Sequence, residues 1–282
     1  MSTPRRPMMC WYGSKWRIAP WVIANLPHHE EYVEPFGGAL GVLLRKPRCH
    51  SETINDLDSE IVNLYRVLRD PEQASRLIDA CRLTPFSREE FEEAYIPSEC
   101  PVESARRFIF RSFAGMSSAA LEKKGFRWKH RGKIYSAAQS WFNYPEGLRE
   151  VVQRLSCVII EHLPAIKLIG RYTSPDTLIY CDPPYLKSTR SSSSHAIVYR
   201  HEMSDADHVA LSEALHESPC MVVVSGYPSP LYEDLYADWE CRQLKSYTFD
   251  KTGGGNAPRT ECLWLNPQAV PRVPQQSLRL DR

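Results

Sequence analysis

Hydrophobic positions in this chain fall into short apolar runs that alternate with stretches of helical periodicity, which is the pattern of an α/β protein. The apolar runs predict strands at 32–35, 52–55, 158–160, 178–181 and 221–224. Helical spacing predicts helices over 16–26, 39–44, 58–68 and 205–215. Residues 240–249 and 261–265 predict two further strands, which we expect to close the sheet as an antiparallel pair.

The alternation of strand and helix stops between residues 84 and 144, where the sequence becomes helical, loop-like and rich in cations. We therefore expect a core formed by 10–83 and 145–266, with a helical, basic insert at 84–144. Residues 1–9 predict a loose arm, and the proline- and arginine-rich residues 267–282 predict a disordered tail. Helix starts inside these regions are marked by the N-cap residues Asp70, Ser87 and Ser204.

Composition narrows the class of protein. The formal net charge is +1, so a nucleic-acid surface has to be a local patch. The nine cysteines include no C-x-x-C pair, which argues against a disulfide framework or a zinc site and favours a reducing cytoplasm. No apolar run approaches the roughly 18 residues that a membrane helix needs. We expect a soluble cytoplasmic protein with no membrane or metal partner; the sequence does not identify whether a protein partner exists.

Asp182, Pro183, Pro184 and Tyr185 follow directly after the predicted strand 178–181. The two prolines fix an extended turn and remove two backbone donors, so carbonyl oxygens stay available. An acid and a proline carbonyl can accept hydrogen bonds from a planar NH2 group while the tyrosine ring covers the base. The alternative is an ordinary turn at the end of a strand.

A glycine turn follows the strand at 32–35. Gly37 and Gly38 lie between this strand and the predicted helix at 39–44, an arrangement that lets a ligand approach the backbone closely. The spacing is G-G-x-x-G, and the dinucleotide fingerprint G-x-G-x-x-G is absent. About 20 residues further on, Asp56 ends the second strand, where an acid accepts hydrogen bonds from ribose hydroxyls. Asp56 as a helix cap is the alternative, but the two features together predict a ribose-bearing ligand.

Two cationic segments complete the pattern. Lys15, beside Gly13 and just before a helix, can place an ammonium on a carboxylate or phosphate, or can simply be solvated. The segment 121–135 interleaves aromatic residues with cations, which suits a phosphate backbone with exposed bases. Its cations, the predicted DNA contacts, are Lys123, Lys124, Arg127, Lys129, Arg131 and Lys133.

Four segments stand in one order along the chain: 11–15 (WYGSK), 34–39 (EPFGGA), 55–58 (NDLD) and 182–185 (DPPY). Together they resemble the Dam-type, or D12 class, DNA N6-adenine methyltransferases, in the form often carried by bacteriophages and prophages. The resemblance covers residues 10–266. It implies a class I, Rossmann-like core that binds S-adenosyl-L-methionine, a target-recognition insert, double-stranded DNA as substrate, and work in the cytoplasm of a bacterium or phage-infected host.

Site residues follow from the same resemblance, position by position. Trp11 and Lys15 are expected at the amino-acid end of the cofactor. Phe36, Gly37 and Gly38 are expected to pack against it, Asp56 to hold its ribose, and Glu34 and Asp182 to belong to the same site. Asp182 and the Pro183 carbonyl are expected to accept hydrogen bonds from the adenine amine, with Tyr185 stacked on the flipped base. Leu40 stands where the family pattern has its last glycine.

The expected reaction is a direct in-line methyl transfer with neither a covalent enzyme intermediate nor a metal. Cytosine N4 carries an amine of the same chemistry and is the alternative target, although aspartate at position 182 resembles the adenine enzymes more closely. A catalytically silent DNA-binding homologue is a second alternative, which the intact Asp-Pro-Pro-Tyr segment argues against. A nicotinamide dehydrogenase is disfavoured by the missing G-x-G-x-x-G and by the basic insert.

Overall fold

The computed structural model describes residues 3–116, 125–128, 136–190, 199–249 and 256–270. The strands are β1 (Glu31–Glu34), β2 (Ser51–Asn55), β3 (Val158–Glu161), β4 (Thr177–Cys181), β5 (Met221–Gly226), β6 (Glu240–Phe249) and β7 (Asn256–Leu265). The helices are α1 (Ala19–Ala24), α2 (Ser59–Arg69), α3 (Pro71–Leu83), α4 (Arg88–Glu93), α5 (Pro101–Ala114), α6 (Ala137–Phe142), α7 (Tyr144–Leu155), α8 (Ala165–Ile169), α9 (Asp205–His216) and α10 (Pro230–Leu235). Two 3-10 turns, η1 (Lys15–Arg17) and η3 (Lys187–Thr189), complete the described elements.

All seven strands join one sheet in the order β3-β2-β1-β4-β5-β7-β6. The first five strands are parallel, and β7 runs antiparallel to both β5 and β6. This is the α/β sheet of class I S-adenosylmethionine-dependent methyltransferases, as expected. The strand order reverses between β1 and β4, so the residues that follow these two strands meet at the topological switch point where such sheets bind ligands.

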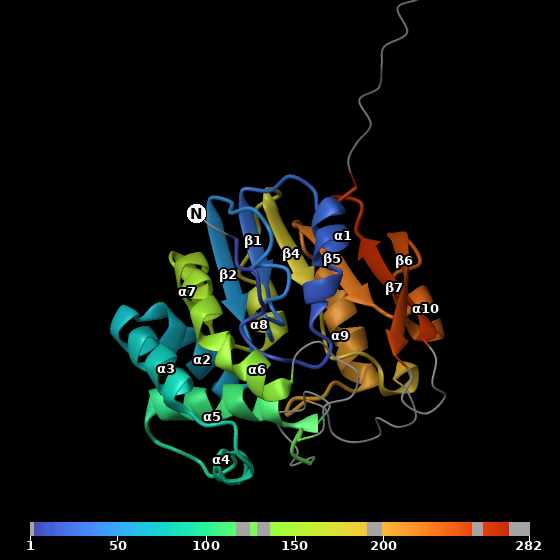
Figure 1. Cartoon of the computed structure of the whole chain (residues 1–282). Helices are drawn as coiled ribbons and strands as arrows, with labels where there is room; N and C mark the ends of the chain where they lie inside the picture. Colours follow the sequence, from blue (N-terminus) through green and yellow to red (C-terminus); the bar gives the residue numbers. More distant parts are fainter. Residues whose placement is uncertain (1–2, 117–124, 129–135, 191–198, 250–255, 271–282) are drawn as a thin grey trace, which may run out of the picture.

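Side chains alternate between the two faces of the sheet and form two apolar clusters. Tyr32 and Tyr180 belong to one cluster, whereas their neighbours Val33 and Cys181 belong to the other. Figure 1 shows the sheet in the middle of the molecule, with α2, α3, α5 and α7 gathered on the side of β2 and α10 on the side of β6. The buried faces of these helices supply many further residues of the apolar clusters.

The predicted N-caps are confirmed. The side chain of Asp70 accepts a hydrogen bond from the backbone of Gln73, and that of Ser204 accepts one from Asp207 in a full capping box. Ser87 accepts from the backbone of Glu90. These bonds satisfy backbone donors that the first turn of each helix leaves without a partner.

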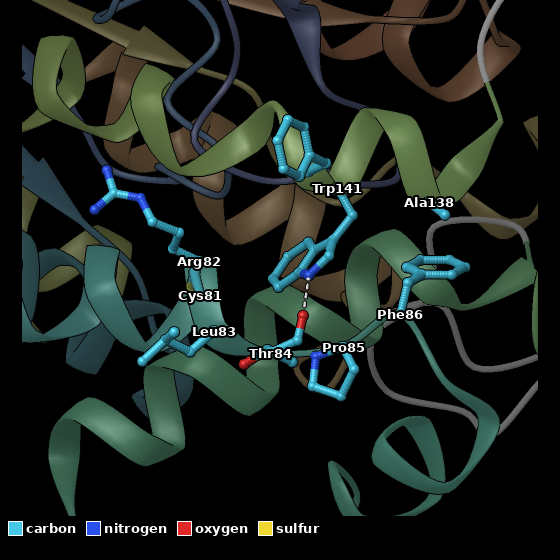
Figure 2. A pocket seen from close by; sticks show the side chains of 9 residues that line it. Cys81, Arg82, Leu83, Thr84, Pro85, Phe86, Ala138 and Trp141 are labelled. Carbon is cyan, nitrogen blue, oxygen red and sulfur yellow. Dashed lines mark hydrogen bonds between the residues drawn. The ribbon is translucent and has the colours of Figure 1, made fainter.

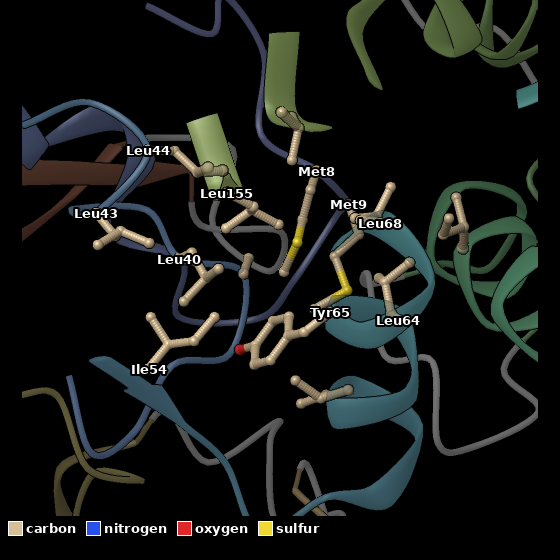
Figure 3. Packing of buried hydrophobic residues seen from close by; sticks show 14 of the residues in the cluster. Met8, Met9, Leu40, Leu43, Leu44, Ile54, Leu64, Tyr65, Leu68 and Leu155 are labelled. Carbon is tan, nitrogen blue, oxygen red and sulfur yellow. The ribbon is translucent and has the colours of Figure 1, made fainter. Parts of the chain in front are cut away.

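The N-terminal arm is anchored, so the expectation of a loose arm over 1–9 is wrong for its last residues. Met8 and Met9 are fully buried in the same apolar cluster as Leu40 and Tyr65 (Figure 3). Burying each methionine stabilises the fold by about 1.5–3 kcal/mol. The anchor lies immediately before the 11–15 segment and therefore fixes where that segment begins.

Two other expectations are corrected. Residues 39–44 form hydrogen-bonded turns and no helix, because Gly38 and Leu40 both adopt positive φ angles, 50° and 54°. The tail begins with a packed turn over 267–270, in which the Ala269 backbone donates to Asn266 and its side chain is buried. Residues 271–282 lie outside the described part of the chain. No helix among the described residues is long and apolar enough to span a membrane.

Candidate active site

Asp182 follows β4, and one of its carboxylate oxygens contacts two polar side chains. The Lys15 ammonium lies 2.8 Å from Asp182 Oδ1, and the Ser225 hydroxyl donates to the same oxygen at 2.9 Å. Ser225 is in turn held by the Tyr180 hydroxyl, which donates to it at 3.1 Å. Within the described residues, Oδ2 of Asp182 accepts no hydrogen bond, so this oxygen is available to a donor from a ligand.

Glu261, on β7, joins the same group of side chains. Its Oε1 lies 3.8 Å from the Lys15 ammonium and accepts a hydrogen bond from the Tyr185 hydroxyl. Burial raises the pKa of Glu261, and the nearby Lys15 ammonium only partly opposes this rise. Burial also disfavours the charged form of Lys15, but Asp182 and Glu261 outweigh it and raise the Lys15 pKa, so the ammonium stays charged.

Glycines bring Lys15 to this position. The backbone of Gly41 packs directly on the start of η1, where an added Cβ would lie only 2.8 Å from the Trp16 nitrogen and 3.1 Å from the Lys15 nitrogen. A residue with a side chain would therefore push the two segments apart. Lys15 also donates to the carbonyl of Gly13 at 2.9 Å, which curls its side chain back toward the sheet.

Asp56, the residue predicted to bind the ribose hydroxyls, lies against the glycine turn. The backbone nitrogens of Gly38 and Asp58 donate to its two carboxylate oxygens, each at 2.9 Å. Asp58 is the N-cap of α2, so the alternative that Asp56 merely caps this helix is wrong. Removal from water raises the pKa of Asp56 to about 6. A Cβ on Gly38 would lie 3.1 Å from Trp11 Nε1, so the structure brings Trp11, Gly38 and Asp56 together.

Glu34, at the end of β1, is an acid inside the protein. Its side chain accepts a hydrogen bond from the Tyr32 hydroxyl at 2.9 Å, and only 2% of the residue is exposed. Burial raises its pKa to about 8. Phe36 follows at the same end of the strand, half-buried against the second apolar cluster. Glu34 and Phe36 therefore lie at the switch point together with Asp182.

Several residues of this site were missed from the sequence. Ser225 lies in the last two residues of β5, the neighbour of β4, and the rule that carboxyl ends of parallel strands meet would have found it. Tyr199 packs against Trp11 with ring centroids 6.3 Å apart and donates to the Tyr12 carbonyl at 3.3 Å. No local signal marks Tyr199 or Glu261, since both reach the site through tertiary packing.

The predicted DNA contacts are described only at Arg127. Its guanidinium is half-buried and donates to the Gly115 carbonyl at 2.9 Å. Among the interleaved aromatic residues, Phe126 is buried against Phe86 and Phe91, whereas 62% of Trp128 is exposed. Phe126 is therefore a core residue. Outside the described residues lie Lys123, Lys124, Lys129, Arg131 and Lys133.

A separate cavity of about 290 Å³ lies between the end of α3 and α6 (Figure 2). It is bridged by a hydrogen bond from Trp141 Nε1 to the Thr84 carbonyl at 2.9 Å, and its rim includes the exposed side chains of Leu83 and Phe142. None of the predicted site residues lines it. Among the described residues, no three His, Cys, Asp or Glu side chains are grouped as a metal site would require.

The sequence matches the family of D12 class N6 adenine-specific DNA methyltransferases over residues 11–247. A Type II methyltransferase of Lactococcus lactis subsp. cremoris, M1.LlaDCHI, is 26% identical over 260 residues, covering 86% of this chain and 88% of the relative. A DNA adenine methylase of Vibrio cholerae is 24% identical over 275 residues, covering 93% and 96%. The Type II methyltransferase M.MjaIII of Methanocaldococcus jannaschii is 24% identical over 239 residues, covering 74% and 78%. A phage origin stays a prediction. The chain belongs to the D12 class of N6 adenine-specific DNA methyltransferases.

Proposed function

We propose that this DNA adenine methyltransferase uses Asp182 and its neighbours to activate N6 of an adenine flipped out of double-stranded DNA. S-adenosyl-L-methionine supplies the electrophilic methyl group. The reaction takes place where the family's DNA substrate lies, in the cytoplasm of a bacterial or phage-infected cell. Two relatives are named Type II methyltransferases, which supports a place in restriction-modification for this chain.

The residues at the glycine turn fit this cofactor. Asp56 offers carboxylate oxygens to ribose hydroxyls, and the close approach of Trp11 to Gly38 provides an aromatic wall. Glu34 and Phe36 follow β1 at the same edge. Asp56, whose pKa is about 6, is ionised at neutral pH and suits a ligand that carries a positive sulfonium. Lys15 is placed beside Asp182, so its expected contact with the amino-acid end of the cofactor stays a prediction.

Asp182 activates the N6 amine of the flipped adenine. The N6 lone pair of adenine is delocalised into the ring, so the free amine is a weak nucleophile. Oδ2 of Asp182 accepts a hydrogen bond from one N6–H and the Pro183 carbonyl accepts one from the other. These two bonds favour a tetrahedral nitrogen with an exposed lone pair. Lys15 and Ser225 hold Oδ1 and so aim the carboxylate. As N6 becomes methylated, its surplus proton passes to Asp182 and from there to solvent.

Tyr185 stacks on the flipped base while the turn of Pro183 and Pro184 holds its backbone. Lys15 Nζ lies 4.6 Å from the centroid of the Tyr185 ring and covers one face, and we assign the base to the other face. We propose that 84–144 is the target-recognition insert. Its basic segment, with Arg127 the described member, contacts the DNA backbone.

The observation that carries this proposal is the convergence of Lys15, Ser225 and Asp182, with Oδ2 left to a ligand. The test is transfer of a labelled methyl group from S-adenosylmethionine to unmethylated plasmid DNA, followed by nucleoside analysis. We expect N6-methyladenine. N4-methylcytosine as the product would overturn the base assignment. Absence of transfer despite retention on immobilised S-adenosylhomocysteine would favour a catalytically silent relative.

A further inference from the structure

Glu261 is the buried acid of the site to which the methyl-transfer scheme gives no task. It lies on β7, across β5 from the strand that carries Asp182, and only 5% of the residue is exposed. A buried carboxylate is costly unless paired and hydrogen-bonded. Among the described residues, its polar contacts at the site include Lys15 and Tyr185, the same residues that aim Asp182 and face the base.

The Lys15 ammonium lies between two carboxylates. It is 2.8 Å from Oδ1 of Asp182, 3.8 Å from Oε1 of Glu261 and 2.9 Å from the Gly13 carbonyl. A lysine is a flexible chain with a point charge, so several anchors are needed to fix it. Glu261 supplies a second carboxylate anchor, and this restricts where the ammonium lies against the reacting carboxylate.

The Tyr185 ring is held from three directions. Its hydroxyl donates to Glu261, the Lys15 ammonium covers one face, and Tyr227 packs against it in a T-shaped contact with ring centroids 4.7 Å apart. The hydroxyl bond fixes how far the ring reaches from the turn that carries it. The ring face left for a stacked base therefore has a set position.

We propose that Glu261 is a positioning residue for methyl transfer, fixing Lys15 on Asp182 and the Tyr185 ring against the flipped base. The inference rests on the proposed function. It acts through the two residues that Glu261 contacts, so it predicts an effect on the chemical step that exceeds any effect on cofactor or DNA binding.

The test is Glu261→Gln, which keeps the shape of the side chain and removes its charge. Single-turnover methyl transfer to unmethylated plasmid DNA, with enzyme and S-adenosylmethionine saturating, should slow by about 10- to 100-fold, since small misplacements of reacting groups have effects of this size. The dissociation constants for S-adenosylhomocysteine and for the plasmid should stay within about threefold of the wild type. Glu240→Gln, the same change at a half-exposed position on β6, is the matched control and should leave the rate unchanged.

A double-mutant cycle with Tyr185→Phe separates positioning from a general structural role. If Glu261 acts through the Tyr185 hydroxyl, Glu261→Gln should slow Tyr185→Phe by a smaller factor than it slows the wild type. Effects that multiply in full would overturn this arm of the proposal. Should Glu261→Gln fail to fold, Glu261→Asp keeps the charge but shortens the reach, and a wild-type rate in that variant would overturn the proposal.

The outcomes also separate this inference from the proposed function. A wild-type protein that makes no N6-methyladenine would defeat the proposed function. A wild-type protein that makes N6-methyladenine, together with an equally fast Glu261→Gln variant, would overturn only the role of Glu261. Loss of rate matched by an equal loss of cofactor affinity would also overturn it, because a positioning residue should change kcat and leave binding in place.

Discussion

The Lys15 ammonium lies 2.8 Å from Oδ1 of Asp182, with side-chain exposures of 7% and 18%. Removing one member of a buried ion pair leaves the other charge without compensation, which costs about 3–5 kcal/mol. Truncating Asp182 to alanine would therefore mix a fold defect with a catalytic defect. The isosteric Asp182→Asn also removes the charge, but it keeps a hydrogen-bond acceptor beside Lys15, whose ammonium still has Glu261 at 3.8 Å, and is therefore the better probe of the reaction.

Asp182→Asn should lower methyl transfer by about 10²- to 10⁴-fold, because the variant cannot accept the N6 proton as a carboxylate does. DNA affinity should stay within severalfold, since the change lies at the reacting group. Labelled methyl transfer and a gel-shift titration measure the two quantities. Asp176→Asn, an exposed acid at the other end of β4, is the control. A rate within severalfold of the wild type for Asp182→Asn would remove Asp182 from the mechanism.

Asp56 should make cofactor binding depend on pH. Its pKa is raised to about 6, and ribose hydroxyls bind the carboxylate better than the neutral acid. The affinity for S-adenosylhomocysteine should therefore be full above pH 6 and fall by up to about tenfold per pH unit below it. Isothermal titration between pH 5 and pH 7.5 measures this dependence.

Asp56→Asn is the variant that isolates this group. Asp58 and His201 also face Asp56 and remain in the variant, so any dependence due to them persists. The variant should bind more weakly at neutral pH and lose most of the slope below pH 6. Asp79→Asn, exposed on α3, should behave as the wild type. An unchanged slope in Asp56→Asn would show that another group controls the pH dependence.

The strand core could be predicted from the sequence because its signals are local. Apolar runs ended by turn residues located the strands, and caps such as Asp70 located helix starts. The segment 39–44 could not be predicted in this way, since its apolar residues have helical spacing. Their conformation is set by the positive φ angle of Leu40 and by close packing of Gly41 on η1, and both depend on contacts distant in the sequence.

In the candidate site too, the residues marked by local sequence signals could be predicted, and those placed by contacts distant in the sequence could not. Asp56 and Asp182 were predicted because each directly follows a strand of the parallel sheet. Glu261 reaches the site through the antiparallel register of β7, in which Ser225 pairs with Leu263. No spacing in the sequence fixes that register. Met8 and Met9 escaped notice because prolines and arginines dominate the composition of the arm that carries them.

The basic segment should govern the salt dependence of DNA binding. Replacing Arg127, Lys129 and Arg131 together by glutamine should make the negative slope of log affinity against log salt shallower. The change should be about 0.9 for each DNA phosphate that the segment no longer neutralises. Binding to plasmid DNA at a series of salt concentrations measures the slope. Because Arg127 also donates to the Gly115 carbonyl, thermal unfolding should accompany the measurement.

Removal of three exposed arginines from other elements, Arg66, Arg76 and Arg149, is the matched change in net charge. It should leave the slope close to that of the wild type if the contacts are local to the basic segment. Equal slopes for the two triple variants would instead indicate a diffuse charge effect and contradict the assignment.

Glu34 should make the fold itself sensitive to pH. Its pKa is about 8 in the folded protein and lies near its ordinary value of 4.5 in the unfolded chain, so the folded state holds a proton that the unfolded state has lost. The stability associated with this group is therefore full below pH 4.5 and is lost progressively up to pH 8, at up to about 1.4 kcal/mol per pH unit. In Glu34→Gln this loss is absent, and every other titrating group is shared. Urea denaturation at pH 5.5, 6.5, 7.5 and 8.5, roughly the window set by these pKa values, measures the free energy of unfolding of both proteins. The value for the variant minus that for the wild type should rise with pH and level off above 8. A difference that stays constant across these conditions would mean that Glu34 is already ionised in the fold. The burial of its charge would then be compensated by a cation, because the hydrogen bond from Tyr32 does not compensate it.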